Sequence, residues 1–342
     1  MRTLPATLAI LVTGLHGCAS VTAVPRAAIA HAPRAAARTS FVAARTGASA
    51  APAPAGPPFA VGERTITFVD TSRTVRFPGR PPEPRTLVTV IRYPAQGPRS
   101  GVDLPNAPPA RTARRFPLVI FGHGFAVTPA PYARLLQAWA RAGYVVAAPI
   151  FPLGNANAPG GPNESDIVNQ PRDMSFVITR MLELDGTPHS FFQGLIAPHE
   201  IAVSGQSDGG ETALAVAYDR HFLDRRVRAA VIMSGAELPG VGVLHFSAPS
   251  PPLLATQGTA DTTNQPRFTY AFFDAAPRPK FLLSLLGASH LPPYTNEQPQ
   301  LGVVERVTIA FLTKYLKNGK RATARMLAAG TVPGVAAIQA DP

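Results

Sequence analysis

The pentapeptide Gly205-Gln206-Ser207-Asp208-Gly209 is the segment that most constrains how this chain can fold. The apolar run Ile201-Ala202-Val203 precedes it and a helix-compatible run, 211–217, follows it, so the order is strand, sharp turn, helix. Such a turn needs residues without bulky side chains two positions before and two positions after its centre, where the two glycines stand. A turn centred on Asp208 would instead place a glutamine at one of these positions. The pattern therefore predicts a nucleophile elbow centred on Ser207.

A second glycine-containing segment, Gly122-His123-Gly124-Phe125, directly follows the apolar run 116–121. In proteins with a nucleophile elbow, a loop at this place donates one backbone N–H to the oxyanion, and the residue after the nucleophile donates the other. Here these donors are the N–H groups of Phe125 and Asp208. We also expect His123 and Phe125 to line the substrate pocket, with the His123 ring supporting the loop. The alternative is an ordinary glycine-rich turn.

Two residues downstream have the chemistry and the order of a catalytic triad. Asp261 follows the strand-like run 252–256, and His290 follows the apolar run 281–286 and is the only histidine after Asp261. We predict that His290 takes the proton of Ser207 and that Asp261 holds the imidazole in the required tautomer. A loop aspartate that begins a turn or caps a helix is the alternative for Asp261. The histidines and acids show no metal-ligand spacing, so we expect neither a metal nor a cofactor.

From about residue 64 to 318 the chain resembles a Ser-His-Asp α/β-hydrolase, most of all the branch with cutinase-like polyester hydrolases, chlorophyllase-like esterases and platelet-activating-factor acetylhydrolases. The resemblance is carried by residues 122–125, residues 205–210, Asp261 and Gly287-Ala288-Ser289-His290. It implies hydrolysis of carboxylic esters through an acyl-enzyme.

The chain also departs from the polyester hydrolases. Gln206 and Asp208 stand where those enzymes usually carry His and Met, and Met233-Ser234-Gly235-Ala236 lacks their Trp. We therefore expect short to medium acyl esters and aliphatic polyesters as substrates, and aromatic polymers less so. A peptidase or amidase with the same triad, and a non-catalytic surface lipoprotein on a hydrolase scaffold, are the alternatives.

Apolar runs alternate with helical patterns, which predicts the α/β class: an α/β-hydrolase fold with a mostly parallel sheet of about eight strands and helices on both faces. The expected strands lie near 65–70, 86–93, 116–121, 144–150, 200–204, 228–234, 252–257 and 280–286. The first helix is expected to have Thr128 as its N-cap and to end before Gly143, and the last to span 298–318 and stop at Gly319.

The sequence contains no segment suited to a large lid. The excursion 235–246 is rich in glycine, and 151–171 reads as a loop because of its glycines, asparagines and prolines. The catalytic domain is expected to span 61–320. Residues 321–342 are a weakly patterned C-terminal tail, to which we assign no role.

The N-terminal residues are typical of an exported protein. Residues 1–17 carry Arg2 followed by an apolar stretch that is too short to span a membrane. The stretch ends in Leu15-His16-Gly17-Cys18-Ala19, which resembles a bacterial lipoprotein box around the only cysteine of the chain. We expect lipid attachment at Cys18. The alternative is a plain secretory signal cut further on.

Residues 18–60 are rich in Ala and Pro, and such a composition cannot bury a core, so we expect a disordered tether. The formal net charge of +12 is spread without basic runs or interleaved aromatic residues, which argues against nucleic-acid binding. The expected partner is the ester substrate, with membrane contact only through a lipid anchor. We expect a monomer located in the cell envelope or secreted.

Overall fold

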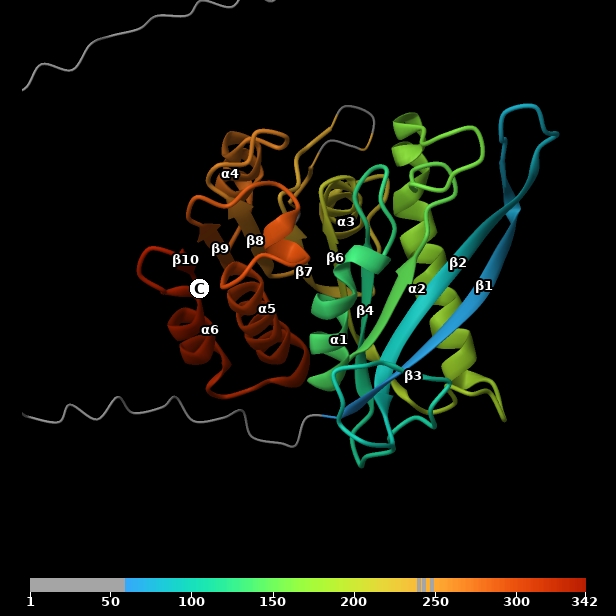
Figure 1. The fold of residues 1–342 in the computed structure, drawn as a ribbon, viewed down its shortest axis with the longest axis horizontal. Helices are drawn as coiled ribbons and strands as arrows, with labels where there is room; N and C mark the ends of the chain where they lie inside the picture. The colour runs from blue at the N-terminus through green and yellow to red at the C-terminus, as the bar shows by residue number, and fades with distance from the viewer. Residues whose placement is uncertain (1–58, 239–240, 242–243, 247–248) are drawn as a thin grey trace, which may run out of the picture. The chain divides into compact units, whose positions relative to one another are not determined.

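The structure is a computed structural model and describes residues 59–238, 241, 244–246 and 249–342. The expected export signal, Cys18 and nearly all of the expected tether lie outside the described residues. From residue 59 onward, the chain builds one ten-stranded sheet with helices on both faces (Figure 1). The expected α/β-hydrolase fold is therefore confirmed.

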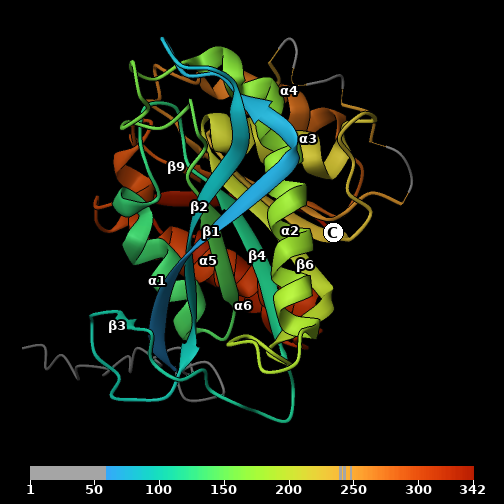
Figure 2. The same cartoon turned by 90° about the vertical axis from the view of Figure 1, so that its right-hand side faces the viewer.

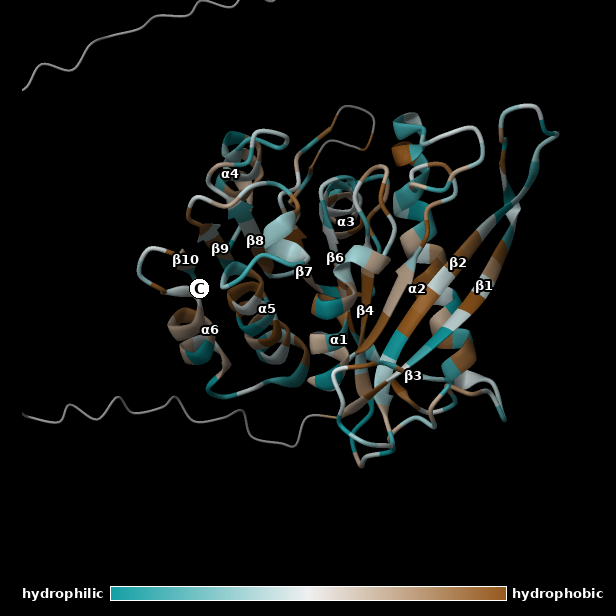
Figure 3. Ribbon diagram, viewed as in Figure 1, coloured by the Kyte–Doolittle hydropathy of each residue, from teal (hydrophilic) through white to brown (hydrophobic). Residues whose placement is uncertain are grey.

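Six parallel strands form the centre of the sheet: β4 (Phe116–Gly122), β5 (Val145–Pro149), β6 (Ile196–Gln206), β7 (Val227–Met233), β8 (Leu253–Gly258) and β9 (Lys280–Leu285). Every residue of β4, β5 and β8 is buried. A parallel strand covered on both faces must be apolar along its whole length, which explains why these strands could be located as uninterrupted apolar runs. Figure 3 shows hydrophobic residues along β2 and β4 and more hydrophilic residues in the connecting loops.

The remaining strands extend the sheet at both edges. On one side, β1 (Ala60–Val75) and β2 (Glu83–Ala95) form an antiparallel hairpin, and β3 (Leu104–Pro105) pairs with β1. On the other side, β10 (Ala336–Asp341) pairs antiparallel with β9. The strand order is β10-β9-β8-β7-β6-β4-β5-β2-β1-β3, so the sheet has ten strands rather than about eight.

Residues 321–342, the segment expected as a weakly patterned C-terminal tail, form regular secondary structure. They form α6 (Ala322–Gly330), which packs against α5 (Gln300–Lys317), and then β10. Only a few positions of these short elements are buried, so their apolar periodicity in the sequence is weak.

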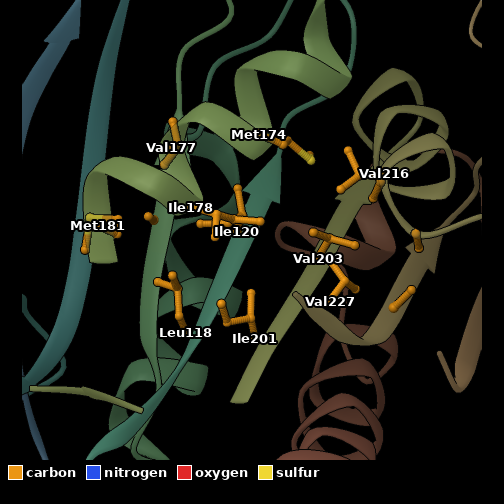
Figure 4. Packing of buried hydrophobic residues seen from close by; sticks show 14 of the residues in the cluster. Leu118, Ile120, Met174, Val177, Ile178, Met181, Ile201, Val203, Val216 and Val227 are labelled. Carbon is orange, nitrogen blue, oxygen red and sulfur yellow. The ribbon is translucent and has the colours of Figure 1, made fainter. Parts of the chain in front are cut away.

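The helices divide into two layers, as the two views in Figures 1 and 2 show. One face of the sheet is covered by α1 (Ala133–Arg141), α5 and α6, and the other by α2 (Gln170–Gly186), α3 (Asp208–Tyr218) and α4 (Pro266–Ala275). Alternate residues of β4 serve the two layers: Leu118 and Ile120 pack with the second set, and Val119 and Phe121 with the first. In Figure 4, Met174 and Ile178 of α2 lie beside Ile120.

Two predicted helix ends differ from the structure. The first helix begins with a 3-10 turn, η1 (Ala130–Tyr132), and becomes α-helical only at Ala133. Thr128 nevertheless accepts a hydrogen bond from the N–H of Ala130, at 3.3 Å. At the other end of the chain, Asn318, not Gly319, takes the left-handed conformation that ends α5, with φ 55°.

The expected loop 151–171 is partly helical, because residues 164–169 form the 3-10 helix η2 (Glu164–Asn169) and Pro171 already lies in the first turn of α2. An ion-pair cluster holds this region against β2. The Arg85 guanidinium is buried and donates to both carboxylate oxygens of Asp166, at 2.9 and 2.7 Å, and of Asp173, at 2.7 and 2.6 Å. Between β7 and β8, the described residues contain no helix, in keeping with a fold without a large lid.

Candidate active site

The sharp turn between β6 and α3 positions Ser207. Its backbone has φ 55° and ψ −129°, a conformation that residues with side chains rarely adopt. A Cβ on Gly205 would overlap the backbone of Gly209, and a Cβ on Gly209 would overlap the carbonyl group of Gly122. The Ser207 N–H donates to the carbonyl oxygen of Met233 at 3.0 Å, which ties the turn to β7. Close backbone packing therefore requires both glycines and holds the strained serine in place.

The structure brings Ser207, Asp261 and His290 together from three separate loops at the carboxyl ends of parallel strands. His290 Nε2 lies 2.9 Å from Ser207 Oγ, and His290 Nδ1 lies 2.7 Å from Asp261 Oδ2. Asp261 is buried, whereas the His290 side chain keeps 18% of its surface exposed. With Nδ1–H donating to the carboxylate, Nε2 is left with a lone pair that faces the serine hydroxyl.

Four hydrogen bonds hold the Asp261 carboxylate. Oδ1 accepts from the backbone N–H groups of Thr263 and Asn264 at 2.9 and 3.0 Å, while Oδ2 accepts from His290 and from the Gln257 amide, the latter at 3.2 Å. Burial acts to raise the pKa of Asp261, but the hydrogen bonds and the charge of His290 outweigh it, so the pKa lies below its ordinary value. Gln257 was not predicted as a site residue, because its position in β8 gives no sign in the sequence that its amide turns toward the carboxylate.

The loop that follows β4 lies directly against the elbow. A Cβ on Gly124 would be 3.2 Å from the Cβ of Ser207. The next residue, Phe125, is half-buried in a turn, and its N–H donates no hydrogen bond to any of the described residues. Asp208 is the first residue of α3, where a backbone N–H has no acceptor within the helix. Both expected oxyanion donors thus stand on segments adjacent to the serine.

His123 is not free to contact a substrate, which corrects its expected place in the pocket lining. Its ring is 1% exposed, Nδ1–H donates to the carbonyl oxygen of Gly124 at 2.8 Å, and Nε2 accepts from the N–H of Phe151 at 3.0 Å. Burial lowers the pKa of His123 to about 4, so the ring is neutral at neutral pH. Through these two hydrogen bonds, the ring joins the loop after β4 to the backbone of Phe151.

The first turn of α3 carries two buried acids beside the serine. Burial, together with the charge of Glu164, raises the pKa of Asp208 to about 6. Burial and the charge of Asp208 raise the pKa of Glu211 well above its ordinary value. Among the described residues, Asp208 Oδ2 and Glu211 Oε2 have no hydrogen-bond partner. Their surroundings disfavour the ionised form of both side chains, so the charge that Asp208 carries at neutral pH lowers the stability of the fold.

The Gln206 side chain connects Tyr132 to His290, and the sequence did not predict it as a functional residue. Its Oε1 accepts from the Tyr132 hydroxyl at 2.7 Å, and its Nε2 lies 3.1 Å from both the ring Nε2 and the backbone oxygen of His290. Its position inside the elbow is visible in the sequence, but its partners lie 74 and 84 residues away.

A hollow of about 690 Å³ lies between the β1–β2 turn and the loop before η2, but no residue of the Ser207, Asp261 and His290 cluster lines it. Within the described ranges there is no group of three or more His, Cys, Asp or Glu residues arranged to hold a metal ion. None of the described helices is long and apolar enough to cross a membrane.

Comparison with protein families gives a match over the part of the chain that holds the elbow. Residues 104–235 match the family described as Chlorophyllase, and this region contains both the loop after β4 and the nucleophile elbow. No curated protein matches the chain. The order of the sheet and its helical layers show the α/β-hydrolase fold, and residues 104–235 are similar to a hydrolase-type family of that fold.

Proposed function

We propose that the protein is a serine hydrolase that cleaves carboxylic esters through an acyl-enzyme. In the first half of the reaction, Ser207 Oγ attacks the ester carbonyl carbon while His290 Nε2 takes its proton. The N–H groups of Phe125 and Asp208 stabilise the oxyanion, and the alcohol leaves with the proton from His290. In the second half, His290 takes a proton from water, which attacks the acyl-enzyme, and then gives this proton to the departing Ser207 Oγ, which releases the acid and restores the serine hydroxyl and the neutral imidazole.

The observation that carries this proposal is the hydrogen-bonded chain from Ser207 through His290 to Asp261, built on a strained elbow. A serine hydroxyl is a weak nucleophile until a base accepts its proton, and the 2.9 Å contact with Nε2 supports that role. The depressed pKa of Asp261 keeps its carboxylate ionised at neutral pH, where it can stabilise the imidazolium formed during attack.

Substitution of the three residues tests the mechanism. Ser207→Ala and His290→Ala should each reduce the turnover of p-nitrophenyl butyrate by about a thousandfold or more, and the double variant should be no worse than the single ones because the residues act as a unit. Asp261→Asn should cost less than either. A folded Ser207→Ala protein with the wild-type rate would contradict the mechanism. Parallel assays with p-nitroanilides would identify an amidase.

The scope of the substrate follows from the absence of a lid helix between β7 and β8 among the described residues. We expect the highest turnover with roughly C2–C8 acyl esters, because an open site shields little of a longer chain from water. The rate should rise smoothly as the substrate passes its solubility limit. A sharp interfacial activation together with a preference for long-chain triacylglycerols would show that a lid does exist.

The site of action is a further part of the proposal and depends on the N-terminal sequence alone. We propose export, with lipid attached to Cys18, so that residues 18–60 tether the hydrolase to a membrane surface. Expression of the full chain in a bacterium should place it in the membrane fraction, and Cys18→Ser should release or mislocalise it. An intact mass in which the mature protein begins anywhere other than residue 18 would overturn the lipid anchor.

A further inference from the structure

The Gln206 side chain lies between the loop after β4 and the imidazole of His290. It is 1% exposed and makes its contacts at both ends of the amide. The oxygen meets the hydroxyl of Tyr132, and the nitrogen meets the backbone oxygen and ring Nε2 of His290. Gln206 is thus a direct neighbour of the atom that we assign to proton transfer.

The hydrogen-bond partners fix which way round the amide stands. The Gly124 N–H donates to the Tyr132 oxygen at 3.3 Å, so the single hydroxyl hydrogen of Tyr132 is free to donate to Gln206 Oε1 at 2.7 Å. At the other end, the backbone oxygen of His290 can only accept, which requires the NH₂ group at 3.1 Å. Both ends therefore select the same orientation, with a donor facing His290.

This orientation affects what His290 Nε2 can do. In the neutral ring, Nε2 has one lone pair, which faces the hydroxyl of Ser207 at 2.9 Å and the NH₂ group of Gln206 at 3.1 Å. Once Nε2 is protonated, the amide NH₂ offers it no acceptor. The new N–H consequently has no partner on Gln206 that would retain it, and it remains available to the oxygen of the leaving alcohol.

We propose that Gln206 is a positioning residue with two effects. It holds the His290 loop by donating to the backbone oxygen of His290, and it presents a donor to His290 Nε2, so that Gln206 cannot accept the transferred proton. This inference rests on the proposed function. The other charged groups that act on His290 are Asp261, which accepts from Nδ1, and Asp208 at the start of α3. Neither is altered by a substitution of Gln206.

The decisive variant is Gln206→Glu, which keeps the shape but replaces the donor with a carboxylate that can accept from Nε2. We expect the acid limb of the kcat/KM profile for p-nitrophenyl butyrate to move up by about 1 pH unit or more. At the alkaline plateau, kcat should fall about tenfold, because the carboxylate retains the proton. KM should change little, because Gln206 does not face the substrate. Gln339→Glu makes the same chemical change at an exposed position of β10 and should leave the profile unaltered.

Tyr132→Phe is the second test and retains the buried ring while removing the hydroxyl that orients the amide. The amide then keeps only one of its two orienting contacts, the one with the His290 backbone oxygen, so a fraction of the molecules can turn the amide oxygen toward Nε2 and the acid limb should move in the same direction by a smaller amount. Should Gln206→Glu fail to fold by circular dichroism, Tyr132→Phe decides by the same criterion.

The failure of this inference and that of the proposed function give different results. A Ser207→Ala protein that retains full turnover overturns the proposed function itself. An inactive Ser207→Ala protein combined with a folded Gln206→Glu protein whose acid limb coincides with that of Gln339→Glu overturns only the role of Gln206.

Discussion

At the scale of single residues, the candidate site combines strain with unfavourable burial. Ser207 has a left-handed backbone, and the next residue, Asp208, buries a carboxyl group whose Oδ2 has no hydrogen-bond partner among the described residues. Both features reduce stability and persist only where the surrounding packing enforces them. They lie side by side at the start of α3, where the proposed nucleophile and one oxyanion donor stand. The two residues that reduce the stability of the fold, Ser207 and Asp208, are thus also the ones that the proposed mechanism uses.

Asp208 gives a prediction about the pH dependence of stability. Its pKa of about 6 in the folded protein exceeds the ordinary 3.8, so the folded state binds the proton more tightly than the unfolded chain does. The free energy of unfolding should therefore fall as the pH rises from about 4 to about 6. Asp208→Asn should remove this cost and raise the free energy of unfolding above pH 6 by about 2–3 kcal/mol, with no gain below pH 4.

Urea denaturation at several pH values measures this effect. Asp274→Asn, at an exposed position of α4, is the matched control and should change stability by less than about 0.5 kcal/mol throughout. Turnover near pH 8 should persist in Asp208→Asn, because the proposed oxyanion donor is the backbone N–H. A gain in stability that is the same at pH 4 and pH 8 would show that the carboxyl group does not titrate as described.

At the scale of elements, Arg85 joins the β1–β2 hairpin to the helical segment that precedes the elbow. Its guanidinium neutralises Asp166 of η2 and Asp173 of α2, and Arg73 adds a further contact with Asp173 at 2.8 Å. The α2 helix then packs on α3, which begins at the elbow. Buried charge pairs therefore hold the hairpin, η2 and α2 against one another. Sequence patterns normally predict apolar contacts at such buried positions.

Loss of the Arg85 side chain should consequently be far more harmful than loss of a surface arginine. We expect Arg85→Ala to lower the free energy of unfolding by about 3–5 kcal/mol, because two buried carboxylates lose their principal counter-charge. Arg80→Ala, at an exposed position in the turn of the same hairpin, should change it by less than about 0.5 kcal/mol. Thermal and urea melts compare the two. Equal losses of stability in the two variants would mean that the buried Arg85 cluster stabilises the protein no more than solvent-exposed charge pairs do.

At the scale of the whole described unit, the C-terminal residues complete the sheet on the side that leads to His290. β10 covers the edge of β9, and the N–H of Leu286, just after β9, donates to the carbonyl oxygen of Val335 at 2.8 Å. The loop that carries His290 begins at the next residue. β10 therefore stabilises the position of His290, although its first residue, Ala336, lies 46 positions later in the chain.

Deletion of residues 331–342 should expose the edge of β9 and loosen this loop. We expect the melting temperature to fall by several degrees, turnover to decrease, and oligomers to form by edge-to-edge pairing. Gln339→Glu, which leaves the backbone pairing intact, is the control. Size-exclusion chromatography and thermal melts would contradict the expectation if the truncated protein kept the oligomeric state and the melting midpoint of the full chain.

The sequence by itself determined the α/β class, the central strands and the segments that meet at the site. These features are local. Apolar runs of five to seven residues mark strands that are covered on both faces of the sheet. Two glycines in a short motif mark a turn whose close backbone packing leaves no room for a Cβ at either position. Parallel strands then carry the loops after them to one edge of the sheet, which is why the chain order of Ser207, Asp261 and His290 anticipated their meeting.

Only the tertiary structure decided the features that depend on partners far along the chain. The burial of Arg85, the closed environment of His123 and the orientation of the Gln206 amide each depend on contacts that no local pattern encodes. The same holds for β10, in which only Ala336 is buried, so that no periodicity in the sequence marks the strand that pairs with β9. Local sequence fixes where elements form, because propensity and burial act over a few residues. Long-range packing decides which polar groups face one another, because that choice is made only when the elements come together.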